Sequence, residues 1–165
     1  MPLVIEDKEN NLELLFRMVI DLVSLENLRE FGKQLSTEQL RHVPEYATCD
    51  FGWVVSCVTS IVALEDVKIK ARSSKNPFSS VLAWTYGKDV TFNTRKRHSL
   101  ESVTKSVLHE LTHIADKDDA HGFGHGSNFG QGDKQGAAPM LMGELFWEFI
   151  KKNTDSSYIM LTKKA

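Results

Sequence analysis

The sequence of 165 residues contains only two cysteines, Cys49 and Cys57, and it contains four prolines. The two cysteines are too far apart to form a CxxC pair, and no second pair exists that could complete a zinc knuckle. We therefore expect two buried thiols in a reducing compartment. A disulfide between them remains an alternative if the protein is exported.

Long apolar segments and targeting segments are also absent. No stretch of eighteen apolar residues occurs, which excludes a membrane-spanning helix. Residues 1–10 lack the basic region followed by an apolar region that marks a secretory signal. We therefore predict a cytoplasmic protein, with export that needs no signal peptide as an alternative.

The chain has little excess charge of either sign. Its net charge is −2, so no overall electric field indicates nucleic acid or an anionic membrane as a partner. Any partner bound through charge must be argued from a local patch. Apolar residues make up 41% and charged residues 25%, which is typical of a soluble globular domain rather than a disordered chain.

Apolar residues recur at helical spacing near the start of the chain and predict one or two helices within residues 8–32. The expected buried stripe consists of Leu12, Leu14, Leu15, Met18, Val19, Leu22 and Val23. A second periodic segment predicts a buried helix at residues 50–65, although its β-branched residues would also suit a strand.

The period then changes to two. Val67, Ile69 and Ala71 alternate with charged residues and predict a half-buried strand. Residues 81–86 and 90–93 predict two further strands, and the segment 87–89 predicts a hairpin turn between them.

The last third of the chain returns to helical spacing. Ser99 is the expected N-cap of a helix over residues 100–116, and a second helix is expected at 138–150. The segment 115–137 between them contains six glycines and predicts a long loop that binds a metal or a substrate. A short strand is expected at 158–161. The pattern predicts one α+β domain, with a helical part at about 1–65 and the sheet in 66–165.

One motif in the helix 100–116 indicates chemistry. The segment His109-Glu110-Leu111-Thr112-His113 is an HExxH motif. A spacing of four residues places both imidazoles on one helix face, where they can bind the same zinc ion. Glu110 can then act as the general base for a zinc-bound water, since it is adjacent without being a ligand. We predict one zinc ion per chain.

The sequence offers several candidates for the third zinc ligand. His125 is favoured because glycines beside it allow a sharp turn toward the ion. Asp119 has the spacing from His113 of the third ligand in metzincins, but Asp116 occupies the position of their turn glycine. Asp116 could instead orient a ligand imidazole. The full set of candidates is His125, His121, Asp119 and Glu144.

The segment 102–113, followed by His125-Gly126-Ser127-Asn128-Phe129, resembles the small zincin metallopeptidases, and the SprT-like group in particular. The resemblance covers residues 90–129. It implies a single zincin-like domain, in which a small mixed or antiparallel sheet packs on helices and a central helix carries the metal. It also implies that His109, His113 and His125 bind zinc and that Glu110 is catalytic.

The predicted function is a zinc metallopeptidase that hydrolyses peptide bonds in a protein or peptide substrate. The resemblance places residues 90–95 at the sheet edge beside that substrate. Tyr86, Tyr158, Arg95 and His98 are candidates to stabilise the transition state. The alternatives are a non-catalytic zinc module, closed by a fourth protein ligand, and a toxin or effector protease that acts outside the cell. The sequence leaves the oligomeric state open, and it predicts three core aromatics: Trp53, Trp84 and Trp147.

Overall fold

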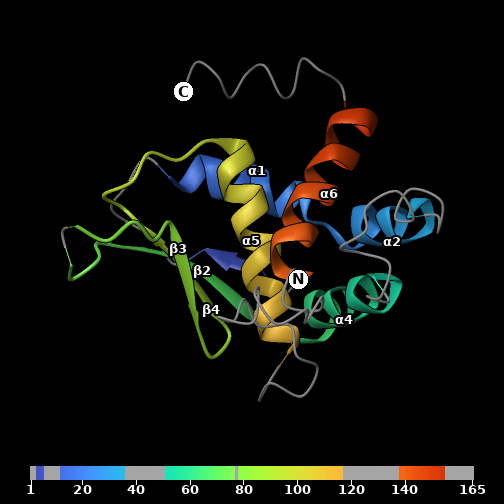
Figure 1. The fold of residues 1–165 in the computed structure, drawn as a ribbon, viewed down its shortest axis with the longest axis horizontal. Helices are drawn as coiled ribbons and strands as arrows, with labels where there is room; N and C mark the ends of the chain where they lie inside the picture. Colours follow the sequence, from blue (N-terminus) through green and yellow to red (C-terminus); the bar gives the residue numbers. More distant parts are fainter. Residues whose placement is uncertain (1–2, 6–11, 36–50, 77, 117–137, 155–165) are drawn as a thin grey trace, which may run out of the picture.

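The computed structural model describes residues 3–5, 12–35, 51–76, 78–116 and 138–154. In this part of the chain, five helices lie against a four-stranded mixed sheet (Figure 1). The helices are α1 (Glu13–Leu22), α2 (Leu25–Gln34), α4 (Phe51–Leu64), α5 (Leu100–Ala115) and α6 (Ala138–Asn153). The predicted α+β class and each of these helices are confirmed, and the N-terminal helical segment is divided into α1 and α2.

The strands are β1 (Leu3–Ile5), β2 (Val67–Arg72), β3 (Ala83–Tyr86) and β4 (Asp89–Asn93), and they lie in the order β1-β2-β4-β3. The β1–β2 and β2–β4 pairs are parallel, and the β3–β4 pair is an antiparallel hairpin. Gly87 has a φ of 62° in the hairpin turn, a backbone conformation that residues with a Cβ rarely adopt.

The sheet order corrects one expectation. Residues 90–95 were expected at the sheet edge, but β4 lies inside the sheet, with β2 on one side and β3 on the other. Among the described strands, β3 is the edge on this side. A substrate peptide therefore cannot pair with β4, because the backbone groups on both sides of β4 already pair with β2 and β3.

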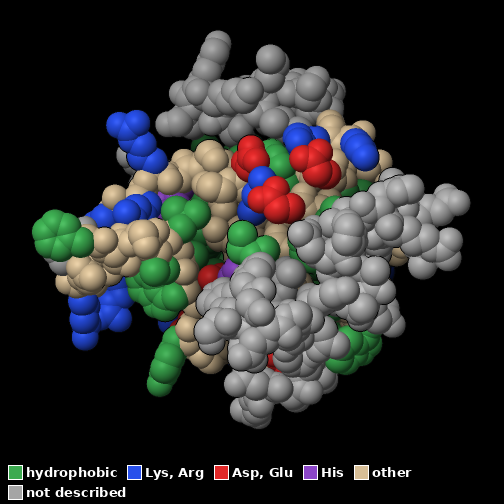
Figure 2. Space-filling model, viewed as in Figure 1, with side chains coloured by type: hydrophobic (Ala, Val, Ile, Leu, Met, Phe, Trp, Pro, Cys, Tyr) green, Lys and Arg blue, Asp and Glu red, His purple; other side chains and the backbone are tan. Residues whose placement is uncertain are grey.

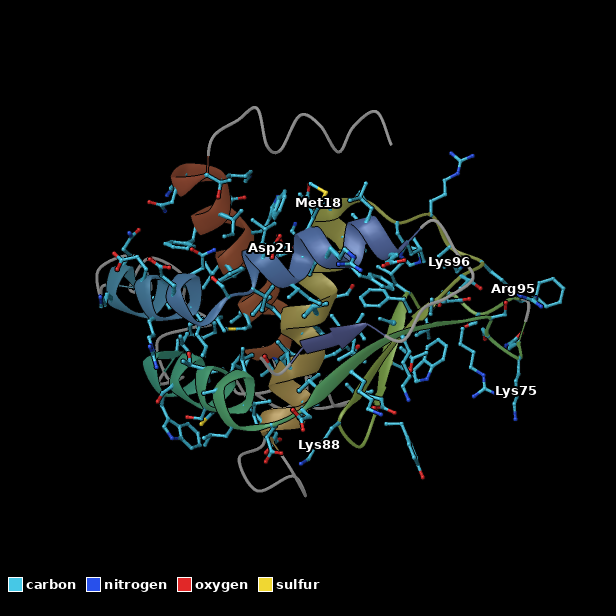
Figure 3. All side chains as sticks on the ribbon, turned by 180° about the vertical axis from the view of Figure 1, so that it is seen from behind. Met18, Asp21, Lys75, Lys88, Arg95 and Lys96 are labelled. Atoms are coloured by element: carbon cyan, nitrogen blue, oxygen red, sulfur yellow. The ribbon has the colours of Figure 1, made fainter. Side chains whose placement is uncertain are left out.

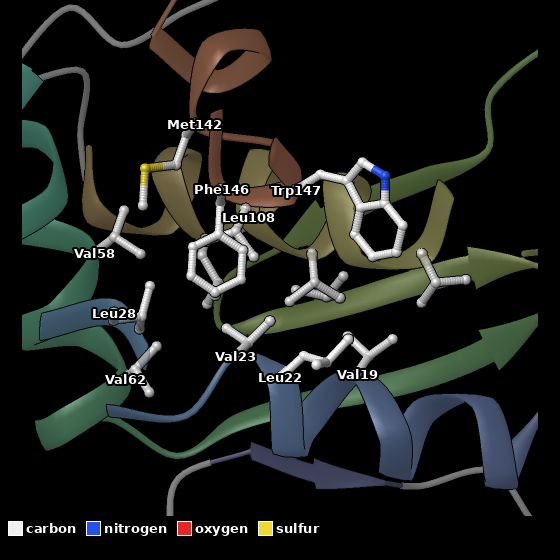
Figure 4. Close-up of a cluster of buried hydrophobic side chains, with 14 of the residues drawn as sticks. Val19, Leu22, Val23, Leu28, Val58, Val62, Leu108, Met142, Phe146 and Trp147 are labelled. Atoms are coloured by element: carbon white, nitrogen blue, oxygen red, sulfur yellow. The ribbon is translucent and has the colours of Figure 1, made fainter. Parts of the chain in front are cut away.

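One hydrophobic core joins the sheet to the helices. Val67, Ile69, Val90 and Phe92 point from the sheet into this core and are fully buried. Helix α5 lies across the middle of the molecule, with the sheet on one side and α4 and α6 on the other (Figure 1). Figure 4 shows side chains of α1, α2, α4, α5 and α6 meeting in one cluster.

Helices α5 and α6 make the closest helix contact in the described chain. A Cβ on Gly143 of α6 would lie 2.7 Å from the carbonyl oxygen of Lys105 in α5. Only a glycine permits this approach, because the obstacle is backbone and cannot change rotamer. The helix that carries the HExxH motif is therefore held tightly by α6.

Several further expectations need correction. Strand β1 was not predicted, so the segment 1–65 is not purely helical. Leu14 is 64% exposed, and Phe16 is buried in its place. Trp147 is buried as predicted, but Trp53 is 40% exposed and Trp84 lies half-buried on the sheet face away from the core.

Two expectations lie outside the described residues: the loop at 117–137 and the strand at 158–161. Among the described helices, none is both long enough and apolar enough to cross a membrane.

Candidate metal centre

The HExxH segment lies in α5, and a complete N-cap determines where this helix begins. The Ser99 hydroxyl accepts a hydrogen bond from the Ser102 backbone N–H at 3.1 Å, and the Ser102 hydroxyl accepts one from the Ser99 N–H at 2.9 Å. The helix continues to Ala115, with Asp116 as its C-cap. Val107, Leu108, Leu111 and Ile114 are buried, as the helical spacing predicted. This packing determines the rotation of α5 about its axis and turns the two histidines to the opposite side.

The two histidine side chains converge. The Nε2 atoms of His109 and His113 are 3.2 Å apart, and the two ring centroids are 4.9 Å apart with the ring planes at 72°. Two nitrogens that bind one tetrahedral zinc ion at about 2.0–2.1 Å lie about 3.3–3.4 Å apart. The observed separation of 3.2 Å is close to this ligand–ligand distance, so the two histidines can supply two zinc ligands with little rearrangement.

Glu110 lies beside this pair and is only 7% exposed. It lines a hollow of about 230 Å³ at the junction of α5, α6 and β3, which we call the α5–β3 hollow. The residues that line the hollow are Leu82, Ala83, Lys105, Ser106, His109, Glu110, Met140 and Glu144. A larger hollow of about 440 Å³ lies between α2 and α6, but no residue of the HExxH segment lines it.

Glu144 was a candidate third ligand, and it lines the α5–β3 hollow from α6. Its carboxylate pairs with the Lys105 ammonium at 2.6 Å, and Lys105 also pairs with Glu101 at 2.8 Å. Within the described ranges, no His, Cys, Asp or Glu joins His109 and His113 in a group of three that could hold a metal. Glu144 therefore serves as an ion-pair partner here and is not brought to the histidines.

The ion pairs affect the titration of Lys105. Burial lowers the pKa of this ammonium, but hydrogen bonds and charge attraction from Glu101 and Glu144 outweigh it, so the pKa lies above 10.5. Lys105 thus remains a cation at neutral pH and links α5 to α6 at the rim of the hollow.

Asp116 is buried at the end of α5. Burial, and secondarily the negative charge of Asp116, raise the pKa of the Cys57 thiol above 9.0. Cys57 is a free thiol, but it is half-buried rather than buried as expected, and Cys49 lies outside the described residues. That Asp116 orients a ligand imidazole stays a prediction.

The candidates for transition-state stabilisation do not line the α5–β3 hollow. Tyr86 is 85% exposed on the other face of the sheet. The His98 Nε2 is 2.9 Å from the Asn93 carbonyl oxygen, to which it can only donate, and its Nδ1 is buried with no hydrogen-bond partner among the described residues. Arg95 is exposed in the connection between β4 and α5. The fourth candidate, Tyr158, lies outside the described residues.

Three of the four candidate ligands also lie outside the described residues: His125, His121 and Asp119. The structure brings together His109, His113 and Glu110. It places the candidate Glu144 in the same hollow as an ion-pair partner of Lys105, and it adds Lys105 and Met140, which the sequence had not placed at the site. The Glu101–Lys105 ion pair could have been predicted from the i, i+4 spacing in the sequence. The ion pair from Lys105 to Glu144 of α6 depends on tertiary packing, so the sequence could not predict it.

Comparisons with protein families, with curated proteins and with solved structures found no match to this chain. The functional argument therefore depends on the geometry of the site.

Proposed function

We propose that this protein is a zinc-dependent metallopeptidase. The observation that supports it best is the 3.2 Å separation of the His109 and His113 Nε2 atoms, which matches the ligand spacing of tetrahedral zinc. His109 and His113 supply two ligands and His125 supplies the third. Three protein ligands leave one position for water, as catalytic zinc sites require.

Glu110 is the general base of the proposed reaction. Zinc bound at this site would lower the pKa of a bound water toward neutrality and polarise the substrate carbonyl. The Glu110 carboxylate accepts the proton of the attacking water and passes it to the leaving amine. Its position in the α5–β3 hollow beside His109 supports this role, because it places the carboxylate next to the proposed metal ligands without making it one of them.

The substrate chain binds along β3 in this proposal. Strand β3 is an edge of the sheet within the described chain, and Ala83 of this strand lines the hollow together with Glu110. An extended peptide can pair with the free backbone groups of an edge strand, which brings a scissile carbonyl close to α5. The corrected sheet order therefore moves the proposed substrate position from β4 to β3.

The first experiment measures zinc in purified protein by elemental analysis. We expect one zinc ion per chain in the wild type and in Glu110→Gln. His109→Ala and His125→Ala should lose most of the zinc, whereas His121→Ala is the matched control and should keep it. Equal zinc in wild type and His125→Ala would refute His125 as a ligand.

The second experiment measures cleavage of an unfolded protein substrate and of a varied peptide mixture. Glu110→Gln should lose about two or more orders of magnitude in rate, because a general base contributes on that scale. Glu148→Gln, on the exposed side of α6, is the control and should cleave normally. Full zinc content without cleavage in the wild type would favour the non-catalytic zinc module instead.

A further inference from the structure

Positive charge is concentrated in one segment of this nearly neutral chain. Between residues 67 and 97 there are eight lysines and arginines and only one acidic residue, Asp89. The whole chain has 20 basic and 22 acidic residues, so the remainder is strongly acidic. Such separation of charge within one domain indicates a local surface for a polyanion.

The pleat of β2 places three of these cations on one face of the sheet. Val67 and Ile69 are buried against the helices, so the alternating residues Lys68, Lys70 and Arg72 point to the opposite side. We call this side the outer face, and it comprises Lys68, Lys70, Arg72, Trp84, Tyr86, Asp89 and Thr91. The described helices pack on the inner face.

The edge strand β3 adds two aromatic side chains to the outer face. Trp84 pairs with Thr91, which in turn pairs with Lys70, and Tyr86 pairs with Asp89, which pairs with Lys68. Each row across the sheet thus has a lysine on β2 and an aromatic ring on β3. The Cα atoms that carry the two rings are about 7 Å apart along the strand, since alternate residues of a strand share a face.

The outer face is hollowed rather than flat. A hollow of about 440 Å³ is lined by Lys70, Arg72, Trp84 and Tyr86, among others. A second hollow of about 380 Å³ shares Arg72 and Trp84 with it and extends to Lys75. The two hollows adjoin at Arg72 and Trp84, so cations and aromatic rings line the same part of the outer face.

Some of these charges are already neutralised and some are not. Lys70 pairs with Asp89 at 2.7 Å, and Lys88 pairs with Glu65. Arg72, Lys75 and Arg95 make no ion pair in the part of the chain that the structure describes. Figure 3 shows Lys75, Arg95 and Lys96 projecting beside the sheet, and Figure 2 shows this basic side apart from the acidic residues over α5 and α6.

We propose that the outer face binds single-stranded nucleic acid. Cations that track a phosphate backbone, together with aromatic rings on which unpaired bases stack, are the combination that such strands require. An acidic peptide would use the cations but would leave Trp84 and Tyr86 without a role. This inference does not need the proposed peptidase activity, because none of the residues it uses lines the α5–β3 hollow. Trp84 and Tyr86 do belong to β3, the strand along which the proposed substrate would pair through its backbone.

Fluorescence anisotropy of labelled single-stranded DNA and RNA of about 15 nucleotides, with the full chain, tests the proposal. We expect salt-dependent binding of one or both strands. Trp84→Ala should weaken it roughly 5- to 150-fold, the range for loss of one stacked base. Arg72→Ala should lower the slope of log affinity against log salt by about 0.7. Binding of duplex DNA should be weaker.

Matched controls lie away from the outer face. Trp53→Ala removes an exposed tryptophan from α4, and Lys152→Ala removes an exposed cation from α6; both should bind like the wild type. Circular dichroism confirms that each variant is folded. The proposal is overturned if neither strand binds, if Trp53→Ala and Trp84→Ala behave alike, or if polyglutamate or vesicles of anionic lipid bind as tightly as the oligonucleotides.

Discussion

Gly143 offers a direct test of how α6 holds the helix that carries the HExxH segment. In Gly143→Ala the new Cβ would lie 2.7 Å from the Lys105 carbonyl oxygen and 3.1 Å from its Cα. An ordinary contact needs a separation larger by about 0.7 Å, and backbone atoms provide no rotamer that relieves it. The two helices must therefore move apart.

The magnitude follows from two opposing effects. Overpacking of this kind costs about 1–3 kcal/mol, and a backbone obstacle places it in the upper half of that range. Replacing a helical glycine by alanine contributes about 1 kcal/mol of helix propensity in return. We expect a net loss of about 1–2 kcal/mol in the free energy of unfolding. In a chain of this length, that loss lowers Tm by roughly 2–8 °C.

The matched control is Gly32→Ala in α2. There the new Cβ would lie 3.2 Å from the Val55 Cγ1, a side-chain atom that can yield by a few tenths of an ångström. We expect this variant to be as stable as the wild type, or more stable by up to about 1 kcal/mol. Urea and thermal unfolding measure both variants. A Gly143→Ala protein at least as stable as Gly32→Ala would refute the close approach of α5 and α6.

Three further predictions concern stability. Ser99→Ala should lower the free energy of unfolding by about 1 kcal/mol in urea unfolding, because the N-cap of α5 is lost; an unchanged midpoint would contradict that role. The pKa of the Cys57 thiol is raised in the folded state, so the protonated thiol contributes stability below pH 9.0 that is lost as the pH rises further. When unfolding is measured above pH 9.0, the Cys57→Ala protein should therefore lose less stability than the wild type. Lys105→Met should cost at most about 1 kcal/mol at neutral pH in thermal unfolding, because the two carboxylates it pairs with are half exposed; a larger loss would mean that these ion pairs are shielded from water.

The elements that sequence predicts well here are those with a local signal. The boundaries of α5 follow from Ser99 and from its apolar spacing, and the alternation of β2 follows from Val67, Ile69 and Ala71. Strand β1 has only three residues and no alternation long enough to detect. The sheet order depends on pairing between segments far apart in the chain, so the sequence pattern could not show that β3 is the edge.

The candidate site divides in the same way. The spacing of His109 and His113 predicts that they share a helix face, and a helix is rigid enough for that spacing to determine their convergence. The pairing of Lys105 with Glu144 depends on the contact between α5 and α6, which Gly143 allows and no local pattern predicts. The outer face was missed because the overall charge of the chain hides the basic segment, and because the register of β2, β3 and β4 is needed to bring its residues to one side.

The register of β3 also makes the two proposals separable. Successive side chains of a strand point to opposite faces, so Ala83 lies toward the α5–β3 hollow while Trp84 lies on the outer face. Trp84→Ala removes a ring from the outer face and leaves the neighbours of Glu110 unchanged. Glu110→Gln changes the hollow and leaves the cations and rings of the outer face in place. Glu110→Gln should therefore lower cleavage and leave binding of single-stranded nucleic acid unchanged, while Trp84→Ala should weaken that binding. Because Trp84 belongs to the strand that the proposed substrate follows, circular dichroism is needed to distinguish loss of the fold from loss of a site.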